Sequence, residues 1–267
     1  MLNAAGPEAF VVRCRIEAAS DCHEASALLE RYLLPLSSRL TDSVHEPELR
    51  VRIERAAGCF QLFVDNTLRA SDSQAIRLVP ELIRCLDDAM IGHLNGLWAV
   101  HAGAVQWGER VLLLPGASHD GKSTLVAELL RRGATYFSDE YALLDRNGCV
   151  HPYPRPLLLR NGRPEQLPSL PEEFSASTGT LPAPVGWIFS LTYRVGDIWS
   201  VAAIPQSEAL VNLLRNTPHV LAETPDLVAA FQRAVEGAQC YAGRRPDAGS
   251  AVDAILGLIG DPPPCRS

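Results

Sequence analysis

The spacing of apolar side chains predicts a small α+β unit at the start of the chain. Alternating apolar and polar positions indicate strands, and apolar positions three and four residues apart indicate helices. The expected elements, in chain order, are a strand at residues 10–17, a helix from Ser20, a hairpin of residues 49–54 and 59–65 that turns at Ala57-Gly58, and, within residues 71–94, a long amphipathic helix that contains Pro80. We therefore expect residues 1–95 to form a separate unit that serves substrate recognition or another interaction.

From residue 96 onward, short apolar strands alternate with helices. Residues 110–114 are almost wholly apolar, as in a strand buried on both faces of a sheet, and an amphipathic helix at residues 121–132 ends at Gly133. Prolines are dense over residues 151–184, which predicts a loop-rich insertion. The other expected elements are strands at residues 97–105, 134–138, 141–144, 149–150, 157–159, 185–193, 199–204 and 240–242, and helices at residues 208–215, 225–236 and 251–259. This order predicts an α/β domain over residues 96–267.

Composition and charge narrow the class of protein. The 267 residues are 47% apolar and contain no apolar run near 20 residues, so we expect no membrane span. Acids and arginines in the first 30 residues do not fit a signal peptide, which favours a cytoplasmic protein. The seven cysteines are scattered and form no C-x-x-C pair, so reduced thiols are expected. A net charge of −7 argues against nucleic acid as a partner, and the sequence leaves a homo-oligomer open.

Lysine usage singles out one position. The 24 basic side chains include a single lysine, Lys122, and the bias toward arginine is itself typical of a GC-rich genome. An ammonium on a thin flexible stem suits a narrow cradle that a planar guanidinium would not fit.

Lys122 lies in a segment that matches the phosphate-binding pattern G-x-x-x-x-G-K-[ST], known as Walker A. The expected nucleotide-binding residues are Gly116, Ala117, Ser118, His119, Asp120, Gly121, Lys122, Ser123 and Thr124. Backbone N–H groups at the start of the helix would bind phosphate oxygens of ATP, Lys122 would neutralise them, and Ser123 would offer its hydroxyl to Mg²⁺. An ordinary turn into a helix is the alternative. Asp120 is unusual here, and we expect its side chain to face solvent or to cap the helix.

An acidic pair follows the next expected strand. If that strand runs parallel to the one before the glycine-rich turn, Asp139 and Glu140 emerge at the same edge of the sheet. One carboxylate could then bind Mg²⁺ while the other orients or deprotonates an attacking hydroxyl. A polar turn between strands is the alternative. His101, at the start of an earlier strand, could hold one of these carboxylates, or it could simply be a half-buried histidine.

Four segments together resemble the catalytic domain of HPr kinase/phosphorylase and related proteins. They are His101-Ala102-Gly103-Ala104, residues 112–124, Arg132-Gly133-Ala134 and Ser138-Asp139-Glu140, and Pro154-Arg155-Pro156-Leu157 adds to the likeness. The resemblance implies a P-loop kinase domain of the phosphoenolpyruvate carboxykinase-like type. Such a domain transfers the γ-phosphoryl group of ATP to a serine hydroxyl.

The resemblance also implies roles for individual residues. Asp139 matches the base that acts on the acceptor hydroxyl, Glu140 matches the acid at the metal site, where the family usually has Asp, and His101 matches the histidine that supports the first acid. The family's downstream glycine-rich signature is missing, and the proline-rich residues 151–184 take its place. Related proteins resemble tailoring kinases that modify a precursor peptide, so a protein or peptide acceptor is expected. An ATP-sensing module without catalysis and a small-molecule kinase are the alternatives.

Overall fold

The computed structural model describes residues 16–33, 49–92, 94, 96–116, 120–218 and 225–260. The chain forms two compact units. Unit 1 contains Met1–Asn95 and Arg155–Leu170, and unit 2 contains Gly96–Pro154 and Pro171–Ser267. Residues 155–170, which the sequence pattern placed with residues 96–267, therefore group with unit 1 by their contacts. Each unit combines helices with a β-sheet, so the fold class is mixed α/β.

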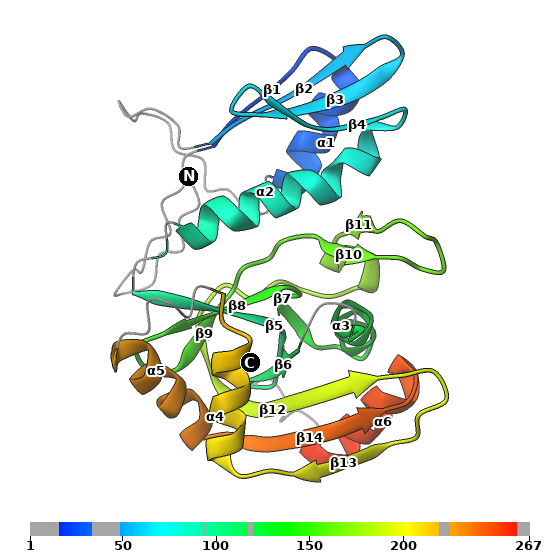
Figure 1. The fold of residues 1–267 in the computed structure, drawn as a ribbon. Coiled ribbons are helices and arrows are strands. Elements are labelled where there is room, and N and C mark those ends of the chain that lie inside the picture. Colours follow the sequence, from blue (N-terminus) through cyan, green and yellow to red (C-terminus); the bar gives the residue numbers. More distant parts are fainter. Residues whose placement is uncertain are drawn as a thin grey trace. The chain divides into compact units, whose positions relative to one another are not determined.

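Unit 1 is built on a four-stranded sheet in the order β1-β2-β3-β4. The strands are β1 (Ile16–Ser20), β2 (Leu49–Ala56), β3 (Cys59–Val64) and β4 (Thr67–Asp72). β1 and β2 are parallel, and the other neighbours are antiparallel. Ala57 and Gly58 both have positive φ, which confirms the hairpin turn predicted between β2 and β3. The helices α1 (His23–Leu33) and α2 (Val79–Gly92) cover one face of this sheet (Figure 1). The predicted strand residues 10–15 lie outside the described residues.

The amphipathic helix predicted within residues 71–94 is found in the second part of that segment, with Pro80 in it. Those residues form the end of β4, the short 3-10 helix η2 (Ala75–Leu78) and α2. Pro80 is the second residue of α2, where a missing N–H costs little because the first turn of a helix has no internal acceptor for it. The proline therefore marks the start of the helix and does not interrupt it.

A short hairpin from the proline-rich segment completes unit 1. Its strands are β10 (Leu157–Leu159) and β11 (Leu167–Ser169), which pair antiparallel. Arg155 Nε lies 3.3 Å from Asp87 Oδ2 of α2, and both side chains are buried. At the surface, Arg77 Nη1 lies 3.3 Å from Glu165 Oε1. These two ion pairs attach the hairpin to unit 1.

Unit 2 contains an eight-stranded mixed sheet in the order β13-β14-β12-β6-β5-β8-β9, with β7 paired to β5. β6, β12 and β14 are parallel, and β5 is antiparallel to β6, β7 and β8. The strands are β5 (Leu97–Trp107), β6 (Arg110–Pro115), β7 (Thr135–Ser138), β8 (Tyr141–Asp145), β9 (Cys149–His151), β12 (Ala183–Tyr193), β13 (Ser200–Ala203) and β14 (Gln239–Arg245). β12 also pairs with β9, so the strands from β12 to β9 close into a ring.

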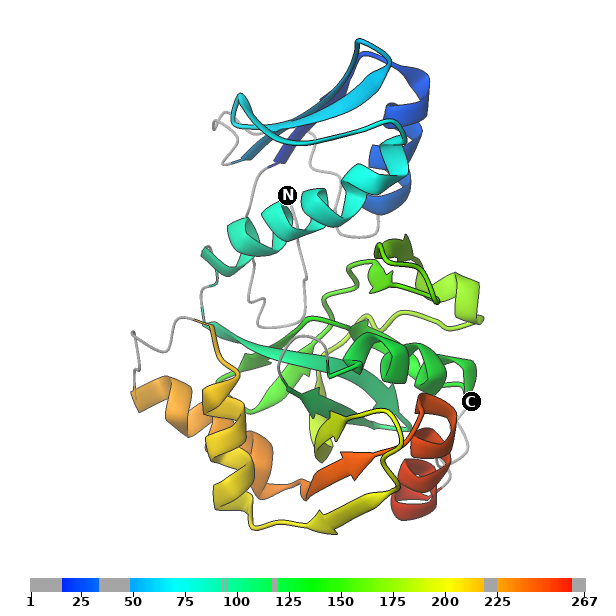
Figure 2. The same cartoon turned by 45° about the vertical axis from the view of Figure 1, so that its right-hand side comes forward.

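Helices cover both sides of this sheet. The helices α3 (Lys122–Arg131) and α6 (Ala248–Ile259) pack together on one side, and α4 (Gln206–Arg215) and α5 (Pro225–Glu236) pack together on the other (Figures 1 and 2). The short 3-10 helix η3 (Pro171–Phe174) lies against α3. All these helices and strands agree with the predicted pattern to within a few residues, apart from η3, which the pattern did not indicate.

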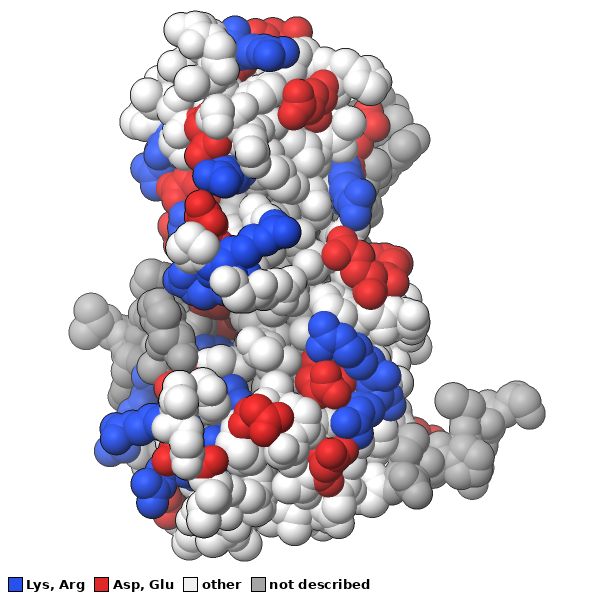
Figure 3. Space-filling view, turned by 90° about the vertical axis from the view of Figure 1, so that its right-hand side faces the viewer, with Lys and Arg blue, Asp and Glu red and all other residues white. Residues whose placement is uncertain are grey.

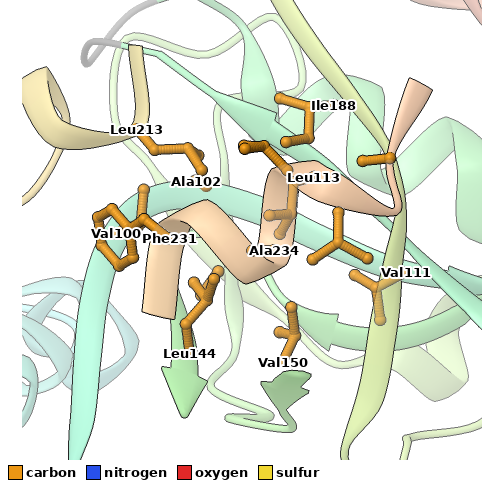
Figure 4. Close-up of a cluster of buried hydrophobic side chains, with 14 of the residues drawn as sticks. Val100, Ala102, Val111, Leu113, Leu144, Val150, Ile188, Leu213, Phe231 and Ala234 are labelled. Carbon is orange, nitrogen blue, oxygen red and sulfur yellow. The ribbon is translucent and has the colours of Figure 1, made fainter. Parts of the chain in front are cut away.

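One hydrophobic core cluster of unit 2 lies between the sheet and the pair α4 and α5. Phe231 and Ala234 of α5 point toward Val100 of β5, Leu113 of β6 and Leu144 of β8 (Figure 4). All five side chains are almost completely buried. Burial of these apolar side chains stabilises the sheet, and the polar residues of the candidate site lie at the ends of its strands.

The face of the molecule in Figure 3 carries acidic and basic side chains side by side, without a large patch of one sign among the described residues. Within the described part of the chain, every helix is too short or too polar to traverse a lipid bilayer.

Candidate functional site

A glycine-containing loop connects β6 to α3. The strand residues before the loop, Val111 to Pro115, are all buried, and α3 begins at Lys122. Gly121, the N-cap residue of α3, has φ 72° and ψ 26°, a left-handed conformation that favours glycine. No side-chain hydrogen bond from this residue caps the helix. Of the expected nucleotide-binding residues, Ala117, Ser118 and His119 lie outside the described residues.

Asp120 does not take either of its expected positions. The N-cap of α3 is Gly121, one residue later, so the prediction of Asp120 as the cap is wrong. The side chain is half-buried, and its Oδ2 atom lies 3.1 Å from the place that a Cβ atom on Gly116 would occupy. The carboxylate therefore folds over Gly116 instead of facing solvent. A glycine at position 116 leaves room for it.

Lys122 is the buried cation of the site. Only 9% of the residue is exposed, and Nζ donates a hydrogen bond of 2.9 Å to the carbonyl oxygen of Gly116, which ties the start of α3 to the end of β6. Burial lowers the pKa of Lys122, and the negative charges of Glu140, Asp139 and Asp120 oppose that shift. The negative charges of three carboxylates thus act on the single lysine of the chain, and two of them belong to the acidic pair expected to accompany it.

Strand register explains why the acidic pair reaches Lys122. β6 and β7 both pair antiparallel with β5, one on each side, so they run in the same direction. Pro115, at the end of β6, lies opposite Ala102, and the N–H of Ala102 donates to the carbonyl oxygen of Glu140. The ends of β6 and β7 are therefore separated by the width of one strand, or about 10 Å. The predicted meeting of the glycine loop and the acidic pair at one sheet edge is found, with β5 between them.

The two acids of the pair differ in exposure and in partner. Asp139 is completely buried, whereas the Glu140 side chain is 31% exposed. His101 Nε2 lies 2.5 Å from Glu140 Oε1, and the His101 ring lies 5.8 Å from that of Tyr141. The resemblance assigned His101 to the support of Asp139, but the structure pairs it with Glu140. His101 and Tyr141 face each other across the β5 and β8 pairing, which positions the imidazole beside the carboxylate.

The remaining expected ligands lie in the first turn of α3. Ser123 is half-buried and follows Lys122 directly, and Thr124 is exposed. Among the described residues, no three or more His, Cys, Asp or Glu side chains gather closely enough to hold a metal ion.

Arg245 is the residue of this site that the sequence pattern did not indicate. It is the last residue of β14, it is buried, and its Nη2 donates hydrogen bonds of 3.0 Å to the carbonyl oxygens of both Asp120 and Gly121. The contact joins residues more than 120 positions apart. No local signal marks Arg245, because it follows another arginine at the end of an ordinary strand.

Comparisons with known proteins do not assign the chain to a family. No protein-family model matches it, and no curated protein sequence is significantly similar to it. Function must therefore be inferred from the site itself.

Proposed function

We propose that unit 2 is an ATP- and Mg²⁺-dependent P-loop kinase domain, of the HPr kinase and phosphoenolpyruvate carboxykinase-like type, that transfers the γ-phosphoryl group of ATP to a hydroxyl group. The observation that supports this most directly is that Lys122, at the start of α3, and the acidic pair Asp139 and Glu140, just after β7, lie at the same edge of the sheet, where both carboxylates act on the charge of Lys122. Phosphoryl transfer needs positive groups around the phosphates and a carboxylate beside the acceptor, and this edge of the sheet offers both.

The residues present fit a phosphate chain with a bound cation. The glycine loop leads directly into the start of α3, where the helix dipole favours an anion. Mg²⁺ bound to a nucleotide commonly takes only one or two protein ligands, because phosphate oxygens and waters supply the rest. The Walker A pattern offers Ser123 as one oxygen donor to the metal and the resemblance offers Glu140 as the other, and a site of this kind needs no cluster of three protein acids.

When bound, MgATP would supply the transferable phosphoryl group and ADP as the leaving group. The acceptor oxygen then bonds to the γ-phosphorus as the bond to the β,γ-bridging oxygen breaks, and the hydroxyl proton passes to a carboxylate of this chain. Lys122 and the α3 amides hold the phosphates in line. His101 holds the Glu140 carboxylate through the 2.5 Å contact.

Asp139 and Glu140 are the two candidates for the carboxylate that accepts the proton of the acceptor hydroxyl. The resemblance assigns this role to Asp139, while the greater exposure of Glu140 favours access of an acceptor to Glu140. The proposal assigns the base to Asp139 and the metal contact to Glu140, and the variants below separate the two. For the acceptor we propose a serine of a protein or precursor peptide, the class that the resemblance over residues 101–140 supports.

The test combines nucleotide binding with phosphoryl transfer. Calorimetric titration of the full chain with MgATP measures binding, and γ-labelled ATP with serine-containing peptides measures transfer. Lys122→Ala should weaken both, because it removes the buried cation. Asp139→Asn should leave binding nearly intact and lower transfer by about 10²-fold to 10⁴-fold, the range for loss of a general base. Arg244→Gln is the control, because Arg244 is exposed and pairs only loosely with Asp197.

Each outcome identifies a different function or a different catalytic base. Absence of MgATP binding by the wild-type chain would refute the kinase and the nucleotide-sensing module together. Tight binding without transfer to any acceptor, and without an effect of Asp139→Asn, would identify the nucleotide-sensing module. If Glu140→Gln abolished transfer and Asp139→Asn did not, the base would be Glu140.

A further inference from the structure

Arg245 makes a set of contacts that converge on the glycine loop. Its Nη2 donates to the carbonyl oxygens of Asp120 and Gly121, each at 3.0 Å, and its Nη1 donates to the carbonyl oxygen of Pro246 at 3.1 Å. The guanidinium lies over the Tyr193 ring, 4.8 Å from its centroid. Both flat groups stand at neighbouring strand ends, because Tyr193 of β12 pairs with Arg245 of β14. The Tyr193 ring thus packs against one face of the guanidinium, and the edge of the guanidinium donates hydrogen bonds to the glycine loop.

The two carbonyl contacts determine where two N–H groups point. In a trans peptide unit the C=O and the following N–H point in opposite directions. The carbonyl of Asp120 shares its peptide unit with the N–H of Gly121, and the carbonyl of Gly121 shares its unit with the N–H of Lys122. With both oxygens turned toward Arg245, both N–H groups are turned away from it. These are the N–H groups at the start of α3.

The same contacts connect α3 to the sheet. The carbonyl oxygen of Gly121 also accepts a hydrogen bond of 3.1 Å from the N–H of Leu125, the first hydrogen bond of the helix. One oxygen therefore joins the first turn of α3 to the end of β14. A Cβ atom on Gly121 would lie 2.4 Å from Arg245 Nη2, so the arginine fits only against glycine at this position.

The charge of Arg245 also acts on the loop. Burial lowers the pKa of Arg245, and Tyr193, Asp120 and Asp247 oppose that shift. A guanidinium begins from so high a pKa that it stays positively charged at neutral pH. Two buried cations thus donate hydrogen bonds to the residues at the two ends of the loop, Lys122 to Gly116 and Arg245 to Asp120 and Gly121, and the negative charge of Asp120 acts on both cations.

We propose that Arg245 is a positioning residue for phosphate binding, which holds the Asp120 and Gly121 carbonyls so that the N–H groups of Gly121 and Lys122 face the phosphates of the nucleotide. This inference rests on the proposed binding of ATP to the loop. It assigns Arg245 no contact with the nucleotide. Its effect therefore concerns ligands with a phosphate chain and not the nucleoside part.

The experiment compares three ligands with four forms of the full chain. MgATP, inorganic triphosphate and AMP are titrated by calorimetry into the wild-type protein and into Arg245→Gln, Arg245→Lys and Arg244→Gln. Arg245→Gln should weaken MgATP and triphosphate binding about tenfold, the effect of losing one charge-assisted hydrogen bond, and leave AMP binding unchanged. Arg245→Lys keeps the charge but lacks the planar fork, so it should remain weak. The neighbouring Arg244→Gln should bind like the wild type, because Arg244 is exposed.

Several results would overturn the proposal. Equal affinity of the wild type and Arg245→Gln for triphosphate would do so, and so would an equal loss for AMP and MgATP, which indicates general damage to the fold. If Arg245→Lys bound MgATP and triphosphate as tightly as the wild type, the positive charge at position 245 would be sufficient and the planar geometry of the guanidinium would not be needed. Failure of the wild-type chain itself to bind MgATP or triphosphate would instead refute the proposed function. Thermal unfolding of each variant, followed by tryptophan fluorescence, shows whether it is folded when titrated.

Discussion

The ion pair between Arg155 and Asp87 allows a quantitative test of what holds the 155–170 hairpin in unit 1. The perturbation is Asp87→Asn, which keeps the shape of the side chain and removes its charge. Arg155 is 1% exposed at its side chain and Asp87 is 5% exposed, with 3.3 Å between Nε and Oδ2. At an effective dielectric constant of about 20, the gross attraction at this distance is about 5 kcal/mol. Removal of one partner of a buried pair typically costs about 3–5 kcal/mol, since the other charge stays buried.

The Arg77 and Glu165 pair is a matched control within the same unit. Its separation is also 3.3 Å, but its side chains are 39% and 47% exposed. Glu165→Gln should cost less than about 1 kcal/mol, because water screens exposed pairs. The double variant Asp87→Leu with Arg155→Met should recover most of the lost stability, since apolar residues replace both charges.

Hydrogen exchange read by mass spectrometry is the assay. The amides of β10, β11 and α2 should exchange about a hundredfold faster in Asp87→Asn than in the wild type, which corresponds to about 3 kcal/mol. Tryptophan fluorescence reports separately on unit 2, because Trp98, Trp107, Trp187 and Trp199 all lie in that unit. Equal effects of Asp87→Asn and Glu165→Gln would refute the reasoning from burial.

Three further predictions concern unit 2. Gly148→Ala should lower the free energy of unfolding by about 3 kcal/mol, because a Cβ atom would lie 2.5 Å from the backbone N of Ala234. Gly133→Ala is the control: it is also at positive φ but has open space around it, so it should cost about 1 kcal/mol. Urea titrations followed by tryptophan fluorescence measure both. For Asp145, burial favours a higher pKa but is outweighed by hydrogen bonds from His151 and from the N–H groups of Cys149 and Asn147, so the pKa is lowered below 3.8. Its stabilising effect is therefore complete above about pH 4 and is lost as the pH falls below it, and the difference in Tm between wild type and Asp145→Asn should shrink there. His101→Gln should lower kcat for phosphoryl transfer about tenfold to a hundredfold with little change in KM for ATP, and an unchanged kcat would contradict a role for the 2.5 Å contact with Glu140.

Local patterns predicted the parts of the site that are continuous in sequence. The buried strand β6, the glycine loop and α3 follow from an apolar run, closely spaced glycines and helical periodicity within about 20 residues. The expected arrival of Asp139 and Glu140 at the same sheet edge rested on strand direction. The hairpin turn at Ala57-Gly58 rests on equally local preferences for positive φ.

Side-chain partners across the sheet could not be predicted in this way. His101 pairs with Glu140 and not with Asp139 because the register of β5 against β8 places it beside Tyr141. The Asp120 carboxylate lies against Gly116, and its negative charge acts on both Lys122 and Arg245. Each outcome depends on a strand offset or a neighbouring charge that periodicity does not encode.

For this protein, the amino-acid sequence alone determined the strand, loop and helix around Lys122, since each depends on the preferences of adjacent residues. Only the tertiary structure decided that Arg245 holds the loop and that residues 155–170 belong to unit 1. Those contacts join residues tens to more than a hundred positions apart, and their geometry follows from how whole elements pack, which no short stretch of sequence specifies.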